Sequence, residues 1–283
     1  MDATAPNQPV MKKTAAAGMQ RILSRLPFLS LWFLSGLLLA FILLPIINMA
    51  ARQTLQSMSL VAAQAEVRSA IWLSLESAAL TALVAVILGT PLAALLARSR
   101  SRFKAVIEAL VDLPLAVPHT VAGIALLLVL SRKGLIGAAT APLGLQFWGT
   151  EAGIVAAMLF VSVPFMVNSA RLGFESVDPQ LEKAARTLGD SPFAVLWRIK
   201  LPLALRGIVT GAILTYARAI SEIGAVMILA YYPMTAPVKI YDLFLQTGLQ
   251  QSSAAAVLLL AVTLSTFLVF RYLANNSWKR SRP

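Results

Sequence analysis

The sequence predicts an all-α membrane protein with six transmembrane helices. Of its 283 residues, 58% are hydrophobic and only 13% are charged, whereas charged residues make up about 25% of a typical soluble domain. This balance indicates hydrocarbon rather than water as the main surroundings. The net charge of +12 lies in clusters between apolar runs, which favours contact with a membrane surface over binding of nucleic acid.

A helix needs about 20 apolar residues to cross the hydrocarbon core. Six stretches meet this requirement: 28–50, 71–97, 110–130, 153–170, 207–230 and 253–274. The first lacks a small-residue cleavage site, so we interpret it as a retained helix and not a signal peptide. The third opens with Asp112, two prolines and His119, so its regular part is expected to start later or to lie in a protein-lined cavity. Gly123 and Gly224 are expected to permit close contact between helices.

Lysine and arginine are unevenly divided between the two sides of this topology. Eighteen lie before the first stretch, after the second and fourth, and at or beyond the end of the sixth, whereas five lie in the other loops. Cytoplasmic loops are enriched in these residues. We therefore expect both termini in the cytoplasm and a multi-pass protein of the cell membrane.

Motifs of several enzyme and cofactor classes are absent from the sequence. It has no cysteine, which excludes disulfides and thiolate metal sites. It also lacks the GxxxxGK[ST] phosphate loop and the HExxH and GxSxG patterns. We therefore expect a transport protein rather than an enzyme, with no catalytic residue, metal or cofactor of its own. A membrane enzyme is disfavoured because no cluster of carboxylates accompanies the single histidine.

The segment 178–202, between the fourth and fifth stretches, predicts a helix, an elbow and a second helix. Asp178 is a good N-cap residue, and a proline follows it at the first helical position. Gly189 can adopt the left-handed conformation that ends a helix. Ser191 and the proline after it begin a second helix, which we expect to end before Pro202.

An apolar stripe runs along the first of these two helices. Its members fall at positions i, i+3, i+4 and i+7: Leu181, Ala184, Ala185 and Leu188. The small residues in its middle let the backbone of another protein approach closely. The basic residues of the loop allow a second interpretation, a surface helix lying along lipid headgroups, and the physical pattern alone leaves both open.

The spacing within this loop resembles the "EAA" loop of type I ABC importer permeases. Two alanines, three residues, Gly189, nine residues and the run Ile199-x-Leu201-Pro202 follow the family pattern. The resemblance implies a coupling helix that docks on a separate ATP-binding subunit. Its contact residues would be Leu181, Glu182, Lys183, Ala184, Ala185, Leu188 and Gly189. The family glutamate stands where this chain has Lys183, and Glu182 lies one residue earlier, so the acidic contact differs.

The resemblance covers about residues 67–272 and implies the type I permease fold. It divides the chain into a cytoplasmic N-tail (1–27), a first helix with its outer loop (28–66), the permease domain (67–272) and a cytoplasmic C-tail (273–283). It implies several partners: a second copy of the chain, two cytoplasmic ATPases that bind ATP and Mg²⁺, an extracytoplasmic oxyanion-binding protein and the lipid bilayer. No nucleic acid is expected.

Four ionisable residues lie within or at the edges of the apolar stretches: Glu76, His119, Arg218 and Glu222. A charge at mid-bilayer costs about 2.5–3.5 kcal/mol on insertion scales, so each must face protein, water or a partner. Arg218 and Glu222 are four residues apart and predict an ion pair on one helical face. The pair either ties helices together or, with Ser221 and His119, lines a translocation pathway in which Arg218 attracts an anion. A lone histidine such as His119 is also compatible with a structural role.

The sequence around Arg218 is similar to that of permeases for tetrahedral oxyanions. The run Arg218-Ala-Ile-Ser-Glu222-Ile-Gly224 carries this similarity, and the following Tyr231-Tyr232-Pro233 is similar to the molybdate/tungstate branch. The resemblance implies import of molybdate or tungstate, with sulfate as the alternative. A secondary anion transporter, driven by an ion gradient, is a further alternative, and the pattern of the 178–202 loop stands against it.

Overall fold

The computed structural model describes residues 9–280, with side chains described for residues 30–274, and these residues form helices joined by short connections. Six of the described helical segments are long and apolar enough to cross a membrane, which confirms the predicted number. They are Ser30–Ala51, Ala65–Arg98, His119–Leu143, Glu151–Glu175, Pro192–Ile220 and Leu249–Ala274. Residues 1–8 and 281–283, which belong to the expected N-tail and C-tail, lie outside the described residues.

Helix α1 (Pro9–Ala51) contains the first of these segments and belongs to a compact unit that ends at Thr54. None of its side chains from Ser30 to Ala51 is buried within that unit. A helix that is apolar on all sides needs apolar surroundings on all sides. This segment is therefore suited to lie in lipid.

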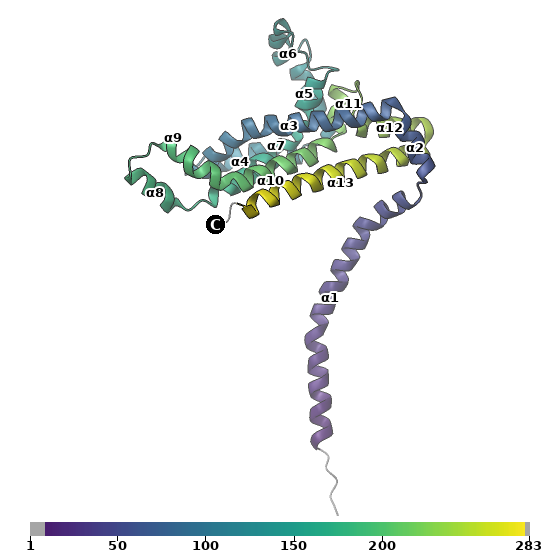
Figure 1. The fold of residues 1–283 in the computed structure, drawn as a ribbon, viewed down its shortest axis with the longest axis vertical. Coiled ribbons are helices and arrows are strands. Elements are labelled where there is room, and N and C mark those ends of the chain that lie inside the picture. The colour runs from purple at the N-terminus through teal and green to yellow at the C-terminus, as the bar shows by residue number, and fades with distance from the viewer. Residues whose placement is uncertain (1–8, 281–283) are drawn as a thin grey trace, which may run out of the picture. The chain divides into compact units, whose positions relative to one another are not determined.

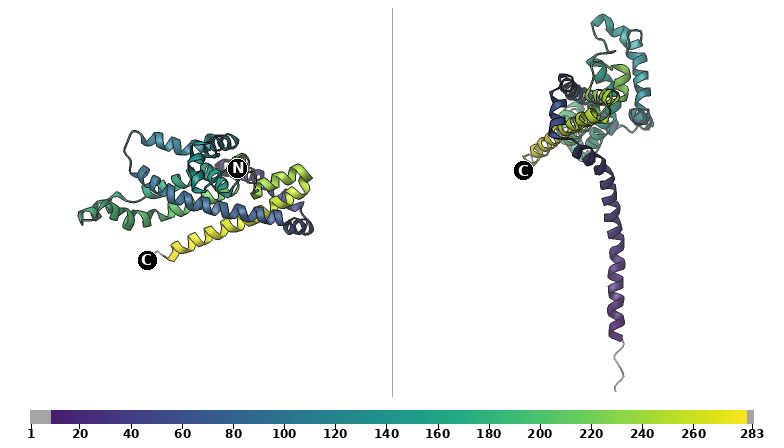
Figure 2. Two further views of the ribbon diagram at one scale, coloured as in Figure 1. Left: turned by 90° about the horizontal axis from the view of Figure 1, so that it is seen from above. Right: turned by 90° about the vertical axis from the view of Figure 1, so that its right-hand side faces the viewer.

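The second unit begins at Leu55 and is a bundle built around α7 (Glu151–Glu175). Helices α3 (Ala65–Arg98) and α10 (Leu201–Ile220) pack on α7, and α13 (Leu249–Arg280) lies beside α10 (Figures 1 and 2). The interior consists mainly of small and branched apolar side chains, among them Ala78, Ala85, Ile154, Val167 and Ala219. Small side chains at these contacts let the helices approach closely, which is what holds helices together in lipid.

Shorter helices complete this unit (Figure 1). At one end lie α2 (Leu55–Ala63), α11 (Gly224–Leu229) and α12 (Ala236–Thr247), and at the other lie α8 (Pro179–Thr187) and α9 (Pro192–Val195). Helix α4 (Lys104–Ala116) packs on α7, and α5 (His119–Leu130), which packs on α11, leads into α6 (Leu135–Thr140) and the 3-10 turn η1 (Ala141–Leu143). Helix α13 runs from the α12 end towards the α8 end (Figure 1).

Two of the expected spans are interrupted rather than continuous. The third, expected over 110–130, is divided between α4 and α5, because Pro118 disfavours the helical conformation at Val117. The fifth, expected over 207–230, is wrong in its extent, since α10 ends at Ile220 and α11 begins only at Gly224. Each interruption places polar backbone groups where the protein itself must supply their partners.

The helix that follows the elbow continues past Pro202, so the prediction that it ends there is wrong. Helix α9 leads into a π-helical turn, η2 (Leu196–Lys200), and then directly into α10. At this turn the N–H of Leu201 bonds to the carbonyl of Leu196, five residues back. The wider turn lets the chain continue, and Pro202 falls in the first turn of α10, where a missing N–H is tolerated.

Facing glycines allow α7 and α10 to pack closely. A Cβ atom on Gly207 would lie only 2.7 Å from the Cα atom of Gly173, so a side chain at this position forces the two helices apart. The pair Gly123 and Gly224 has the same role between α5 and α11, as the sequence predicts. A Cβ atom on Gly224 would lie 2.6 Å from the Cβ atom of His119.

Replacement of Gly207 by alanine is therefore expected to destabilise the folded chain by about 1–3 kcal/mol, the usual effect of overpacking. The matched control is Gly36→Ala in α1, where an added Cβ meets no atom within 4 Å. There the better helix propensity of alanine is expected to raise stability by up to ~1 kcal/mol. Thermal unfolding of the purified chain in detergent measures both effects. Equal unfolding temperatures for Gly207→Ala and the unchanged chain would contradict the close helix contact.

Candidate functional site

A group of polar side chains lies where the two interrupted spans meet. His119 is the first residue of α5, whereas Arg218 lies in the last turn of α10, and Ser221 and Glu222 lie in the break before α11. These four residues are called the helix-break cluster below. They are the residues that the sequence predicts for a translocation pathway, and the fold brings them together although His119 and Arg218 are 99 positions apart.

Arg218 is at the centre of the helix-break cluster. Its Nη2 atom donates a 2.9 Å hydrogen bond to Oε2 of Glu222 and lies 3.0 Å from Nε2 of His119. Its Nη1 atom lies 3.4 Å from the hydroxyl oxygen of Ser221. Because a guanidinium only donates, its contact with His119 is a hydrogen bond only when the facing ring nitrogen carries no proton.

Glu222 is the buried member of the cluster, with only 1% of its surface exposed. Its Oε2 atom faces Arg218, and it lies 3.5 Å from Nδ1 of His119. Its Oε1 atom accepts a 2.9 Å hydrogen bond from the backbone N–H of Ala225, in the first turn of α11. One carboxylate therefore balances the arginine charge and caps a helix. The predicted ion pair is present, although its two residues do not share one continuous helix.

The other members of the cluster form its accessible side. The side chain of His119 is 47% exposed and that of Arg218 is 23% exposed, and Ser221 is also exposed. The first N–H groups of α5 have no partner within that helix and give its start a positive potential. Donors on the accessible side above a buried carboxylate form a surface that can attract an anion and still release it.

Two further polar contacts join helices of the bundle, and the second was not anticipated from the sequence. Thr215 is fully buried, and its hydroxyl donates to the carbonyl of Ser162 at 3.4 Å, so it ties α10 to α7. Nδ2 of Asn168 donates a 2.6 Å hydrogen bond to Oδ1 of Asp112 and so ties α7 to α4. An asparagine inside an apolar stretch, with a carboxylate in the preceding one, was the signal in the sequence for the second contact.

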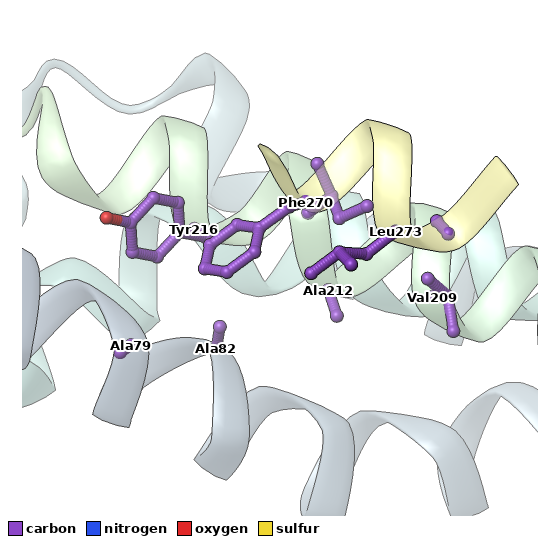
Figure 3. Close-up of a pocket in the computed structure, with 9 residues that line it drawn as sticks. Ala79, Ala82, Val209, Ala212, Tyr216, Phe270 and Leu273 are labelled. Carbon is purple, nitrogen blue, oxygen red and sulfur yellow. The ribbon is translucent and has the colours of Figure 1, made fainter. Parts of the chain in front are cut away.

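An apolar cavity of 460 Å³ lies between α3, α10 and α13. Figure 3 shows that its lining consists of aliphatic side chains and the ring of Phe270, with the hydroxyl of Tyr216 pointing away from the others. The two rings meet edge to face with their centroids 5.2 Å apart. Because this lining has no cation and no row of donors, it suits apolar chains rather than an oxyanion.

The 178–202 loop has the capped helix and the elbow that the sequence predicts. The side chain of Asp178 accepts a 2.8 Å hydrogen bond from the backbone N–H two residues later, at the start of α8. Gly189 has a φ of 96° and follows the end of α8. The side chain of Ser191 accepts a 3.1 Å hydrogen bond from the third following backbone N–H and so starts α9.

The apolar stripe of α8 consists of one buried residue and three exposed ones. Ala185 is packed within the chain and only 7% exposed, whereas Leu181 is 45% and Leu188 is 89% exposed. Ala184 is exposed as well. The stripe is therefore available to another protein only through Leu181, Ala184 and Leu188.

Two exposed aromatic residues of the same loop were not anticipated from the sequence. Phe193 on α9 is 70% exposed and Trp197 on η2 is 55% exposed, and their ring centroids lie 6.0 Å apart. Their separation of four positions was the signal that places them on one helical face. Exposed apolar groups on an otherwise polar loop mark an interaction surface.

Two adjacent residues of α8 have different surroundings. Glu182 forms ion pairs with Arg98, at the end of α3, and with Lys200, at the end of η2. Its carboxylate is thus engaged within the chain. Lys183, which stands at the position of the family glutamate, is exposed and has no ion pair among the described residues.

At the opposite end of this unit a buried lysine ties α12 to α3. Nζ of Lys239 lies 2.6 Å from Oε2 of Glu66 and 3.3 Å from Oδ2 of Asp242. The hydrogen bond to Glu66 raises the pKa of Lys239, against the opposite effect of burial. The stability gained from this contact is therefore complete below the ordinary lysine pKa and is lost only as the pH rises through the raised value. These three residues and Tyr232 line a cavity of 560 Å³.

Comparison with known proteins identifies the family of this bundle. The family model described as the binding-protein-dependent transport system inner membrane component matches residues 89–279. The chain belongs to this family and is a transport permease subunit of an ABC importer. Together with the six membrane-spanning segments, this places it in the cytoplasmic membrane as a multi-pass protein.

Individual relatives point to one branch of the family. The molybdate/tungstate transport system permease protein WtpB of Pyrococcus abyssi is 42% identical over 246 residues, which cover 86% of this chain and 94% of the relative. The sulfate transport system permease protein CysT of a Synechocystis species is more distant, at 32% identity over 202 residues and 70% of each chain. A solved bacterial ABC transporter that imports the acidic polysaccharide alginate has the same fold, with a TM-score of 0.72 at 18% identity over 91% of this chain and 98% of that one.

Because the Glu222 carboxylate both pairs with Arg218 and caps α11, Glu222→Gln is expected to destabilise the folded chain by about 3–5 kcal/mol, as when one partner of a buried ion pair is removed. Glu76→Gln is the matched control, since it removes the same charge from an exposed site on α3 with no ion pair among the described residues. Thermal unfolding in detergent compares the two. If both variants unfold at the temperature of the unchanged chain, the assigned role of Glu222 is wrong.

Proposed function

We propose that the chain forms, with a second copy of itself, the translocation pathway of an ATP-driven importer for molybdate or tungstate. The observation that carries this proposal is the helix-break cluster, where a buried carboxylate holds Arg218 at the meeting point of two interrupted spans. The identity of 42% to a relative named as a molybdate/tungstate permease supports the choice of anion.

The helix-break cluster suits a tetrahedral oxyanion that must pass rather than stay. Arg218 supplies donors, and the start of α5 adds a positive potential where a spanning helix is interrupted. Glu222 already balances the charge of Arg218, so the attraction for a doubly charged anion is moderated. Conduction requires such binding, strong enough for entry and weak enough for exit. Specificity then rests mainly with an extracytoplasmic binding protein.

The ATPase that drives transport would dock on the exposed apolar face of the 178–202 loop. Leu181, Ala184 and Leu188, together with Phe193 and Trp197, present the kind of apolar surface that fills a groove on a partner. The partner would be a cytoplasmic ATPase, one per permease copy, which binds ATP and Mg²⁺. We place the binding protein at the opposite end of the bundle, near α12 and the cavity that Tyr232 lines.

The transport cycle follows from these two docking positions. ATP binding would close the ATPase pair and move the docked α8 helices, which turns the pathway from inward-open to outward-open. The binding protein would then release its anion to the pathway. Hydrolysis of ATP would reset the inward-open state.

Sulfate is the second candidate, because the sulfate permease relative matches 70% of this chain at 32% identity. Sulfate and molybdate are both doubly charged tetrahedral anions, so the same cluster accommodates either. Competition between the two anions during uptake distinguishes these candidates.

Arg218→Gln is expected to lower molybdate uptake roughly tenfold or more, because a charged hydrogen bond to the anion is lost. Arg218→Lys keeps the charge but loses the planar fork, so it is expected to retain part of the uptake. Uptake is measured in proteoliposomes that contain the permease, its ATPase and its binding protein, and size-exclusion chromatography checks assembly.

Full uptake by an assembled Arg218→Gln variant would return Arg218 to a structural role. In the same assay, tungstate is expected to compete with labelled molybdate more strongly than sulfate does. Stronger competition by sulfate would favour the second candidate.

Leu188→Asp is expected to abolish co-purification of the ATPase, because a charge would enter the centre of an apolar contact. The matched control is Leu55→Asp on α2, which makes the same change at a residue that is 88% exposed and lies outside both the loop and the six spans. Ala185→Asp is a poorer test, since Ala185 is buried within the chain and its change would disturb the loop itself. Affinity purification with quantified subunit stoichiometry gives the answer. A Leu188→Asp variant that keeps its full share of ATPase would rule out this docking face.

A further inference from the structure

One carboxylate joins three parts of the chain at the base of the 178–202 loop. Glu182 on α8 pairs through Oε1 with Nη2 of Arg98, the last residue of α3. Through Oε2 it pairs with Nζ of Lys200, the last residue before α10. Each carboxylate oxygen therefore meets a cation from a different membrane span. Arg98, Glu182 and Lys200 are called the coupling clamp below.

Two of the three residues of the coupling clamp are largely removed from water, whereas Arg98 is more exposed. The side chains of Lys200 and Glu182 are 11% and 20% exposed, and that of Arg98 is 37% exposed. Salt screens such partly buried pairs less than surface pairs, and removal of one partner leaves the others with an unbalanced charge. The clamp is therefore expected to stabilise the attachment of α8 more than a surface ion pair would, since the median contribution of a surface pair to folding stability is small.

The second ion pair of the loop provides a contrast. Asp190 and Arg198 lie 3.6 Å apart, with side chains that are 34% and 75% exposed, and both residues belong to the loop itself. It joins the elbow after α8 to η2 and includes no residue of α8. Among the described ion pairs, only those of the coupling clamp join α8 to the rest of the bundle.

Helix α8 has few other attachments. Its most extensive helix contact is with the short α9, and Ala185 is its one buried residue. On the other side of the clamp, Lys200 leads without interruption into α10, a single helix that carries Arg218 in its last turn. A displacement of α8 can therefore reach the helix-break cluster along one rigid element, and it can reach α3 through Arg98.

We propose that Glu182 is a positioning residue that passes the movement of α8 to α3 and α10, and that it makes no contact with the ATPase. This inference rests on the proposed function, because it takes docking of the ATPase on α8 as given. It separates two roles within one short helix: Leu181, Ala184 and Leu188 bind the partner, whereas Glu182 transmits the displacement of α8 that the partner causes.

The test compares Glu182→Gln with Asp190→Asn in the reconstituted permease with its ATPase and binding protein. Both variants convert a carboxylate of the same loop into an amide. Glu182→Gln is expected to retain the full share of ATPase but to lower the number of anions imported per ATP hydrolysed about tenfold, a change typical of lost coupling between sites. Asp190→Asn is expected to leave this ratio unchanged.

A second pair of variants repeats the comparison on α3 and its following loop. Arg98→Gln removes a cation of the coupling clamp and is expected to reproduce the effect of Glu182→Gln. Arg100→Gln removes the same charge two positions later, at an exposed residue with no ion pair among the described residues, and is expected to have no effect.

A structural readout completes the test. The sequence has no cysteine, so spin labels can be attached to Gln180→Cys, an exposed position on α8, and to Arg102→Cys after α3. The distance between the labels is expected to be narrowly distributed with and without ATP, because the clamp makes both sites move together. Glu182→Gln is expected to broaden the distribution.

The outcomes distinguish the inference from the proposed function. Loss of the ATPase from Glu182→Gln would make Glu182 a docking contact and overturn the inference alone. An unchanged ratio of anions to ATP in that variant would do the same. If the unchanged chain neither retains an ATPase nor imports the anion, the proposed function fails, and the inference fails with it.

Discussion

The ion pair between Arg218 and Glu222 lies where the fifth span is interrupted, and several features of the bundle depend on it. Polar backbone groups at membrane depth need partners from the protein, and Glu222 supplies one to the start of α11. The same carboxylate balances the charge of Arg218, which would otherwise be left without a carboxylate partner. The break between α10 and α11 can exist because one buried side chain satisfies both needs. Gly224 then lets α5 approach closely enough to bring His119 to the same place.

The polar residues of the bundle stand at the ends of rigid helices. Helix α10 carries Arg218 near one end, and at its other end it continues from the π-helical turn that ends at Lys200. Pro202 does not interrupt this path, because the wide turn precedes it and places it in the first turn of α10. The tightly packed glycines between α7 and α10 keep the helix in register with the core. The 178–202 loop and the helix-break cluster are thus joined by one continuous helix.

Much of this architecture follows from local sequence. Six apolar stretches of spanning length determine the number of helices, since the thickness of the hydrocarbon core is the same for each. The caps of the 178–202 loop are also local, because Asp178, Gly189 and Ser191 each act on backbone groups within a few residues. The i, i+4 separation of Arg218 and Glu222 is short enough for the pair to form even though the helix ends between them.

The sequence by itself thus determined the spans, the capped loop and the candidate polar residues. Only the tertiary structure decided where the fifth span is interrupted, because that break depends on a carboxylate buried against another helix. It likewise decided that His119 meets Arg218 across 99 positions, and that Ala185 faces inward while Leu188 faces outward. The two cations of Glu182 come from the ends of different elements. Contacts between distant segments depend on how helices pack, and no local pattern of residues encodes that packing.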